Sequence, residues 1–236
     1  MSSVSFILHK PQLSENIGAC ARAIKNFNFK KLVVIDPKPI FPNDKIIATS
    51  VGAKEIIQNS KVYKNLEPAV KKIDYLIATT SRQRNKNIKH IKLNDLNEID
   101  FNKKIGFLFG SEASGLSNNE ISYANCIMQI PTNPEFKSLN LSHSLIIIAQ
   151  VVAGLIKFKK SNYSKSKKIK FSSKKKIQAM TNLCIKNLEN KNFFKPPEKK
   201  PIMLENLISI FYKMELSEKE TRILSSVFAN LAKKVD

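Results

Sequence analysis

The stretch F-G-S-E-A-S-G-L at residues 109–116 directly follows an apolar run, 105–109, that has the composition of a buried strand. A glycine-rich turn at the carboxyl end of a parallel strand is a place where α/β folds bind ligands. The dinucleotide fingerprint G-x-G-x-x-G does not fit it. Gly110 and Gly115 have the spacing of a P-loop, but Leu116 stands where that loop needs lysine. The stretch is therefore a turn for another ligand, or a plain tight turn.

Short apolar runs alternate with helix-like segments through the first two-thirds of the chain. Strands are expected at 4–8, 32–35, 73–78, 105–109 and 126–130, and helices at 16–27, 46–58 and 141–158. Because helices separate consecutive strands, the pattern predicts an α/β fold with a parallel sheet covered on both faces.

The composition changes near residue 157. Residues 157–176 hold ten lysines and few apolar side chains, which is typical of a solvated linker or of an arm that contacts a polyanion. Helical patterns follow at 177–189, 203–214 and 218–232. We therefore expect a first domain over 1–158, a basic linker over 159–174 and a small helical C-terminal extension over 175–236.

The whole chain is strongly basic, with 40 basic and 19 acidic residues among 236 and a formal net charge of +21. Nucleic acid is the commonest partner of such a surface. The alternative is a lysine-rich composition inherited from an AT-biased genome. Only four basic residues are arginines: Arg22, Arg82, Arg84 and Arg222. Since a guanidinium offers phosphate a rigid planar fork that lysine lacks, each arginine marks a place where lysine would not serve.

Several classes of protein are not expected. Cys20, Cys126 and Cys184 lack the spacing of a zinc site, and their odd number argues against a disulfide framework, so no metal is predicted. The longest apolar stretch, 145–156, is interrupted by Gln150 and is too short to span a bilayer. No secretory signal is visible, and we expect a cytoplasmic protein with no membrane partner.

Two further segments have the character of binding sites. At 14–25, S-E-N-I-G-A-C-A-R-A-I-K predicts a helix with Asn16 near its N-cap and with Arg22 outside the apolar stripe, hence accessible. The alternative is an ordinary helix with an exposed arginine. At 130–144, two prolines fix an extended loop that places Ser138 and Asn140 at the entry of the long apolar helix. Free backbone N–H groups there can hold a ligand, although simple capping would select the same residues.

Four stretches together resemble one family closely. They are ENIGACARAIK at 15–25, TTSRQR at 79–84, LFGSEASGL at 108–116 and IPTNPEFKSLNLS at 130–142. They resemble the SPOUT superfamily of knotted methyltransferases, and within it the bacterial tRNA (cytidine/uridine-2′-O)-methyltransferase group. The resemblance covers residues 4–156, and the C-terminal extension is similar more loosely. It implies an α/β-knot, in which the C-terminal part of the parallel sheet is threaded into a trefoil knot. It also implies S-adenosyl-L-methionine as cofactor, tRNA as partner and a homodimer whose two subunits build each active site.

The resemblance also assigns residues. The cofactor-binding set that it implies is Thr79, Thr80, Ser81, Gly110, Ile130, Ser138 and Leu139, with Asn140 supporting the loop. The catalytic set that it implies is Asn16 and Arg22, acting on the RNA ribose, with Glu112 nearby. Two residues depart from the family pattern: Ala78 stands where many relatives have glycine, and Lys137 where serine is frequent.

The activity implied is methylation of a ribose 2′-oxygen, on a cytidine or uridine at the start of the anticodon loop. A sulfonium is already a good leaving group, so the protein must place the oxygen in line with the methyl carbon and help remove its proton. Arginine stays protonated in proteins. We therefore expect Arg22 to hold the adjacent phosphate and to stabilise developing negative charge. A ribosomal RNA 2′-O-methyltransferase of the same fold and a non-catalytic RNA-binding protein remain as alternatives.

Overall fold

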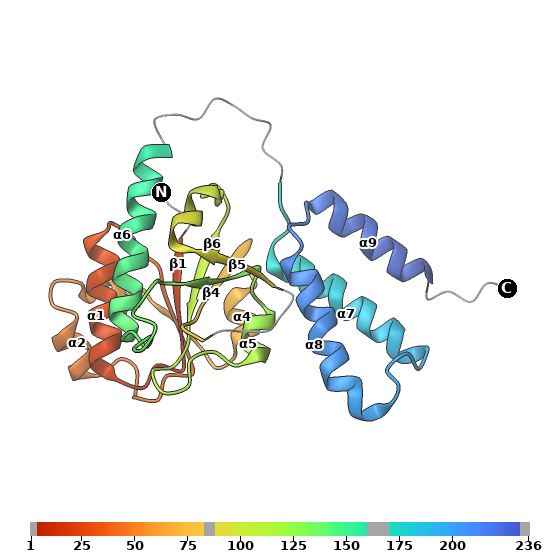
Figure 1. The fold of residues 1–236 in the computed structure, drawn as a ribbon, viewed down its shortest axis with the longest axis horizontal. Helices are drawn as coiled ribbons and strands as arrows, with labels where there is room; N and C mark the ends of the chain where they lie inside the picture. Colours follow the sequence, from red (N-terminus) through yellow and green to blue (C-terminus); the bar gives the residue numbers. More distant parts are fainter. Residues whose placement is uncertain (1–3, 83–87, 160–169, 232–236) are drawn as a thin grey trace.

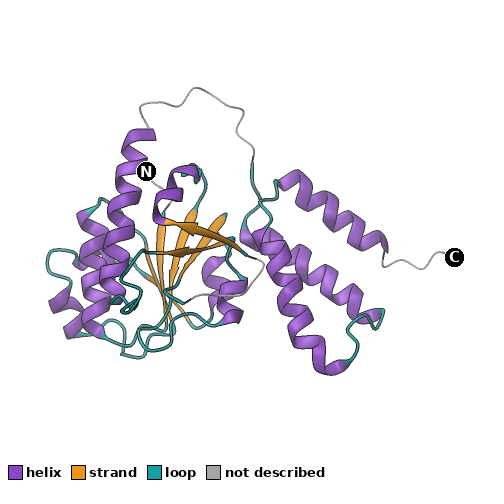
Figure 2. Ribbon diagram, viewed as in Figure 1, coloured by secondary structure: helices purple, strands orange, loops and turns teal. Residues whose placement is uncertain are grey.

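The computed structural model describes residues 4–82, 88–159 and 170–231, which form an α/β domain around one sheet and a group of three helices beside it (Figures 1 and 2). Within these residues a seven-stranded sheet has the order β3-β2-β1-β6-β4-β7-β5. The strands are β1 (Ser5–His9), β2 (Leu32–Ile35), β3 (Lys61–Tyr63), β4 (Tyr75–Thr79), β5 (Lys89–Lys92), β6 (Ile105–Phe109) and β7 (Cys126–Gln129). Every neighbouring pair is parallel, so the predicted parallel α/β sheet is confirmed.

The five expected strands are present within two residues of their predicted ends, whereas β3 and β5 were not predicted. Both are short strands at the two edges of the sheet, and most of their side chains are exposed, so neither carries an apolar run. The single helix expected over 46–58 is wrong. The structure has two short helices there, α2 (Asp44–Thr49) and α3 (Lys54–Gln58), separated by a turn.

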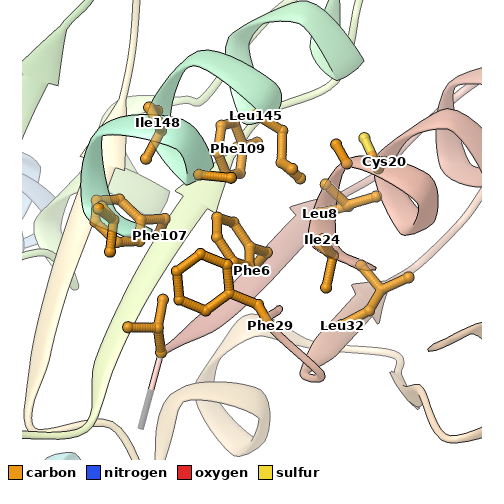
Figure 3. Packing of buried hydrophobic residues seen from close by; sticks show 14 of the residues in the cluster. Phe6, Leu8, Cys20, Ile24, Phe29, Leu32, Phe107, Phe109, Leu145 and Ile148 are labelled. Atoms are coloured by element: carbon orange, nitrogen blue, oxygen red, sulfur yellow. The ribbon is translucent and has the colours of Figure 1, made fainter. Parts of the chain in front are cut away.

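Helices lie on both faces of the sheet and bury its side chains (Figure 2). One face is covered by α1 (Ser14–Asn26) and α6 (Leu141–Lys159). Its core contains three aromatic rings: Phe6 meets Phe29 edge to face at 5.3 Å and stacks on Phe107 at 5.9 Å (Figure 3). The other face packs against α4 (Leu66–Val70) and α5 (Asn118–Ser122). The short 3-10 helix η1 (Leu93–Glu98) follows β5.

The three C-terminal helices have a small core of their own. They are α7 (Lys174–Asn190), α8 (Lys200–Lys213) and α9 (Glu218–Leu231), with the 3-10 turn η2 (Pro197–Lys199) before α8. Their shared core contains Ile177, Met180, Phe211 and Tyr212. The predicted helical patterns at 177–189, 203–214 and 218–232 therefore correspond to observed helices, whereas residues 160–169 of the predicted basic linker lie outside the described residues.

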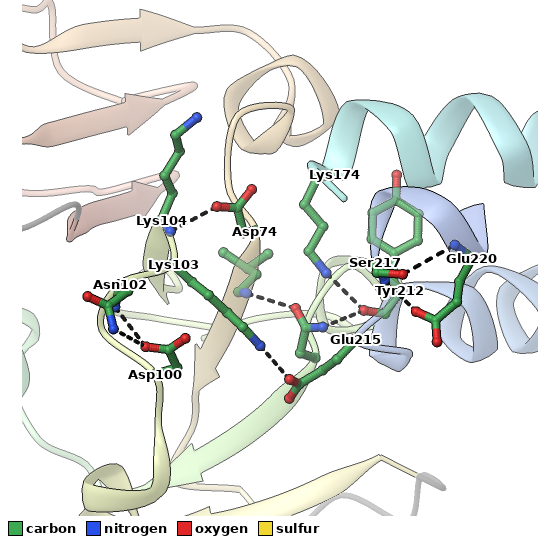
Figure 4. A network of polar contacts seen from close by, with 12 residues as sticks. Asp74, Asp100, Asn102, Lys103, Lys104, Lys174, Tyr212, Glu215, Ser217 and Glu220 are labelled. Carbon is green, nitrogen blue, oxygen red and sulfur yellow. Dashed lines mark hydrogen bonds and ion pairs between the residues drawn. The ribbon is translucent and has the colours of Figure 1, made fainter. Parts of the chain in front are cut away.

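Buried polar contacts dock these helices on the α/β domain (Figure 4). The side chain of Asn125 accepts a hydrogen bond from the Leu76 backbone in β4 and donates one to the carbonyl of Tyr212 in α8, both at 2.8 Å. The Lys174 Nζ atom donates to the same carbonyl at 2.8 Å. The rings of Tyr123 and Tyr212 meet edge to face at 5.3 Å. In the described part of the chain, no helix is both long and apolar enough to cross a membrane.

Candidate functional site

A cavity of about 230 Å³ lies at the carboxyl ends of the adjacent strands β6, β4 and β7. The segments that line it follow these three strands, at 79–82, 109–115 and 128–130, and a fourth segment, 137–144, enters α6. Because parallel strands bring their carboxyl ends to one edge of the sheet, loops far apart in the sequence meet there.

The structure brings most of the predicted cofactor residues together in this cavity. It is lined by Thr79, Thr80, Ser81, Gly110, Ile130, Ser138 and Leu139. Asn140 does not line the cavity, although its neighbours in the sequence, Leu139 and Leu141, do. The cavity also contains residues that the sequence did not single out as ligand contacts: Arg82, Ser111, Ala113, Met128, Lys137 and Ser144. Four of these six residues lie inside the quoted motifs and Met128 and Ser144 lie two residues beyond one, which is the signal that could have found them.

The loop after β6 is shaped by its two glycines. A Cβ atom on Gly110 would overlap the carbonyl carbon of Gly115 and the nitrogen of Leu116. Gly115 has a φ of +67°, in the left-handed region that glycine adopts at little cost. The hydroxyls of Ser111 and Ser114 lie 2.8 Å apart and cross-link the loop. The loop therefore folds back on itself, with the backbone of Gly115 packed against Gly110, and both glycines line the cavity.

A chain of side-chain hydrogen bonds connects three of the predicted residues. The Asn16 amide nitrogen donates to Glu112 Oε1 at 2.8 Å, and Asn140 Nδ2 donates to Asn16 Oδ1 at 2.9 Å. Asn140 Oδ1 in turn accepts from the backbone nitrogen of Ser142, at 2.8 Å, at the start of α6. These contacts join α1, the loop after β6 and the first turn of α6, so they fix the relative positions of three walls of the site.

Glu112 also holds the start of α1, which corrects one prediction. Helix α1 begins at Ser14, two residues before the predicted start, after an N-cap at Leu13, so Asn16 lies inside the first turn and does not itself cap the helix. The carboxylate of Glu112 accepts hydrogen bonds from the backbone nitrogens of Gln12 at 2.8 Å and Leu13 at 3.3 Å. A carboxylate at a helix N-terminus is favourable, because free N–H groups point toward it. Here a residue about a hundred positions away in sequence performs that role.

Arg22 is exposed on α1, as expected, but it is not among the residues that line the cavity. It forms no ion pair with any residue that the structure describes. A single copy of the chain therefore holds Asn16 against Glu112, which lines the cavity, and leaves the Arg22 guanidinium available to bind an anion.

The cysteines are unsuited to nucleophilic chemistry. Cys20, Cys126 and Cys184 are all buried. Burial raises the pKa of each thiol, that of Cys126 to about 11. The reactive thiolate is therefore scarce at neutral pH. Across residues 4–82, 88–159 and 170–231, no three His, Cys, Asp or Glu side chains gather as a potential metal site.

A parallel α/β domain with a glycine- and hydroxyl-lined cavity at the ends of its central strands defines a protein of the ligand-binding α/β class. The chain belongs to the SpoU rRNA Methylase family, whose profile matches residues 3–150. The match covers the whole sheet and the greater part of α6.

Individual relatives carry names for RNA-modifying enzymes. A tRNA (cytidine-2′-O-)-methyltransferase, TrmJ of Methanocaldococcus jannaschii, is 33% identical over 150 residues, which are 61% of this chain and 65% of that protein. This first relative is thus matched over less than two thirds of its length. A tRNA (cytidine/uridine/adenosine-2′-O-)-methyltransferase, TrmJ of Pseudomonas aeruginosa, is 26% identical over 92% of this chain and 89% of its own. The crystal structure of TrmJ from Z. mobilis ZM4 superposes with a TM-score of 0.86 at 27% identity, covering 97% of this chain and 99% of that one.

Proposed function

We propose that this chain is an S-adenosyl-L-methionine-dependent tRNA methyltransferase that modifies the ribose 2′-oxygen of a cytidine or uridine at the start of the anticodon loop. The observation that carries the proposal is the convergence of seven residues, assigned from sequence motifs, on one cavity. The relatives from Methanocaldococcus jannaschii and Pseudomonas aeruginosa, which are named as tRNA 2′-O-methyltransferases, support tRNA as the substrate.

The lining of the cavity suits a ligand with both polar and apolar surfaces. Hydroxyls of Thr80 and Ser138 lie in the lining together with the apolar side chains of Ile130 and Leu139. The absence of a Cβ at Gly110 lets the backbone of Gly115 and Leu116 pack against it, and this packing sets the shape of the wall that the loop gives the cavity. S-adenosyl-L-methionine has such a mixed surface, and when bound it supplies a methyl group on a sulfonium. These residues would bind it, and we assign Thr79 and Ser81 to the same wall.

The three residues assigned to catalysis divide into two roles in this proposal. Asn16 and Glu112 position the start of α1 against the cofactor loop, because their polar atoms are engaged with each other and with the backbone. Arg22 remains available to RNA. Its guanidinium would hold the phosphate next to the target ribose and stabilise negative charge on the 2′-oxygen as the proton leaves.

A homodimer would explain why Arg22 lies outside the cavity of its own subunit. The exposed apolar residues Leu13 and Ile146 lie at the starts of α1 and α6. Gly154 in α6 has open space where a Cβ would be, which suits close packing of a helix from a second copy. In this arrangement, Arg22 of one subunit would reach RNA held at the cavity of the other.

Two finer features of the fold belong to the proposal. We infer a trefoil knot in the C-terminal part of the sheet, and the order β6-β4-β7-β5 supports it, since β7 lies between two strands formed earlier in the chain. We also propose the boundaries 1–158, 159–174 and 175–236, with the lysine-rich linker and the helical extension contacting the tRNA backbone. A tRNA-modifying enzyme of this kind would work in the cytoplasm.

A ribosomal RNA substrate is the second candidate, and the description of the SpoU rRNA Methylase family is the observation that favours it. The two candidate substrates are distinguished by incubating the protein with methyl-labelled S-adenosyl-L-methionine and either unmodified tRNA transcripts or unmodified ribosomal RNA. Label in tRNA alone supports the proposal. Label in ribosomal RNA alone supports the second candidate, and a protein that binds RNA but no cofactor would be a non-catalytic RNA-binding protein.

A further inference from the structure

The turn between α7 and α8 lies at the end of α7 that points away from the sheet (Figure 1). An aromatic side chain in this turn is exposed to solvent. Phe193 is 54% exposed in this turn. Its backbone nitrogen donates to the Leu188 carbonyl at 3.0 Å, and its own carbonyl accepts from the Lys195 nitrogen at 2.9 Å. Asn192, with a φ of +52°, ends the helix in the left-handed conformation that asparagine tolerates. The exposed ring is therefore carried by an ordered backbone.

A second, buried aromatic ring packs against Phe193. Phe194 is only 8% exposed and meets Phe193 edge to face, with ring centroids 5.4 Å apart. The Lys200 ammonium lies 5.9 Å from the Phe194 ring centre and forms an ion pair with Glu189 at 2.8 Å. Phe193 is thus held in place on one side and open on the other. Phe193 is not among the residues that form the core of the three helices or pack against it.

The surroundings of Phe193 are positively charged. Lys191, Lys195 and Lys199 are exposed, and none of them pairs with an acidic side chain among the described residues. The acid Glu189 is neutralised by Lys200, which leaves Glu198 as the acidic residue of the turn. An exposed aromatic ring among unpaired lysines is the combination that binds single-stranded nucleic acid, because the ring stacks on a base and the cations hold the phosphates.

We propose that this turn, residues 190–200, is an RNA-binding site in which Phe193 stacks on an unpaired base while Lys191 and Lys195 contact the flanking phosphates. The inference rests on the proposed function, since it takes the substrate to be an RNA. The turn lies in the C-terminal extension, apart from the cofactor cavity, so it holds the RNA at a point away from the methylated ribose. Stacking on an aromatic ring tolerates any base, and the site therefore anchors the RNA without selecting a sequence.

The test is the affinity of the full chain for an unmodified tRNA transcript, measured by fluorescence anisotropy at a fixed salt concentration. Phe193→Ala is expected to weaken binding at least about fivefold, and Phe193→Tyr to keep it near wild type. The control is Val62→Ala, which removes an apolar side chain of similar exposure, 49%, from the edge strand β3, outside the C-terminal extension, and should leave affinity unchanged. The double variant Lys191→Gln/Lys195→Gln should reduce the slope of log affinity against log salt concentration by the equivalent of about two phosphate contacts.

The outcomes separate this inference from the proposed function. Phe193→Ala binding tRNA as tightly as wild type overturns the inference, whether or not the chain transfers methyl groups. If that variant instead loses self-association while keeping its RNA affinity, the turn contacts protein and the inference also fails. Weaker binding by Phe193→Ala, in a wild-type chain that binds tRNA but transfers no methyl group, supports the RNA site and counts against the proposed function.

Discussion

Lys174 is a buried amine at the junction between the α/β domain and the C-terminal helices, and it makes the stability of that junction depend on pH. The residue is 2% exposed, and its Nζ atom donates to the Tyr212 carbonyl at 2.8 Å (Figure 4). Burial lowers the pKa of Lys174 to about 7, although Cys126, Glu215 and Asp74 act in the opposite direction and Lys103 adds to the lowering.

The sign of the pH effect follows from where the proton is bound. Between about pH 7 and 10.5, the unfolded chain carries a proton on Lys174 that the folded chain has lost. Stability therefore rises with pH through this window and reaches its lowest level below about pH 7, where both states are protonated. The pKa of Lys174 is about 7 in the folded chain and 10.5 in the unfolded chain. At about 1.4 kcal/mol per pH unit, this difference limits the pH-dependent gain in the free energy of unfolding to about 5 kcal/mol. From pH 7.5 to 9 the expected gain is roughly 2 kcal/mol.

The perturbation is Lys174→Met, which removes the titrating amine but keeps a long side chain. The Tyr212 carbonyl keeps a partner in this variant, because Asn125 also donates to it. The free energy of unfolding is measured by urea denaturation with circular dichroism, at several values of pH from 6.5 to 9. Wild type should gain roughly 2 kcal/mol relative to the variant between pH 7.5 and 9. The three cysteines lose protons in the unfolded chain near pH 9. This changes the free energy of unfolding of wild type and variant alike, so it cancels in the comparison.

The matched control is Lys175→Met, which changes the exposed neighbour in the same turn and should keep the pH dependence of wild type. Equal pH dependence of wild type and Lys174→Met would refute the reasoning. A wild-type protein that loses stability relative to the variant as pH rises would contradict the prediction as well, because it would mean that the folded protein binds the Lys174 proton more tightly than the unfolded chain does.

Three further predictions concern the cavity. Gly110→Ala should weaken S-adenosyl-L-methionine binding at least about tenfold in calorimetry, since the new Cβ would collide with Gly115 and displace the loop. The circular dichroism spectrum of this variant should remain normal. Unchanged affinity would show that the loop does not contact the ligand. Asn140→Ala should lower the unfolding free energy by about 1–2 kcal/mol in urea denaturation, because it removes both the cap of α6 and the bond to Asn16. Asn140→Asp, which keeps the cap, should lose less. Arg22→Ala should abolish most methyl transfer while cofactor affinity stays within about twofold of wild type. Arg22→Lys should recover little of the methyl transfer if the phosphate contact is bidentate. Near-normal turnover of Arg22→Ala would contradict the role given to this residue.

The strands that the sequence predicted are those with a continuous apolar run. Residues 105–109 and 32–35 lie between two strands in a sheet covered on both faces, so nearly every side chain is apolar. The edge strand Lys89–Lys92 buries only Ile91, and a single buried residue gives no periodic signal. The helix expected over 46–58 was wrong because apolar spacing continues across a turn, and Gly52, which has a φ of +72° there, is the local signal that could have indicated it.

The cavity was easier to predict than the contacts that support it. Its lining comes from short motifs, which assigned the cofactor residues through the family resemblance of the four stretches together and not one by one. The hydrogen bonds from Asn16 to Glu112 and from Asn140 to Asn16 span 96 and 124 residues, and no local pattern can indicate such pairs. Lys174 shows the same difficulty. In the sequence it is one of ten lysines in a basic run, and only the packing of α7 against the sheet buries it.

The central claim is tested most directly by locating the methyl group. Unmodified tRNA transcript is incubated with the protein and methyl-labelled S-adenosyl-L-methionine, then hydrolysed with alkali, which cleaves RNA only where the 2′-hydroxyl is free. We expect label in one alkali-resistant dinucleotide that begins at the first nucleotide of the anticodon loop. Label released in ordinary mononucleotides would mean that a base is methylated, and it would contradict the account.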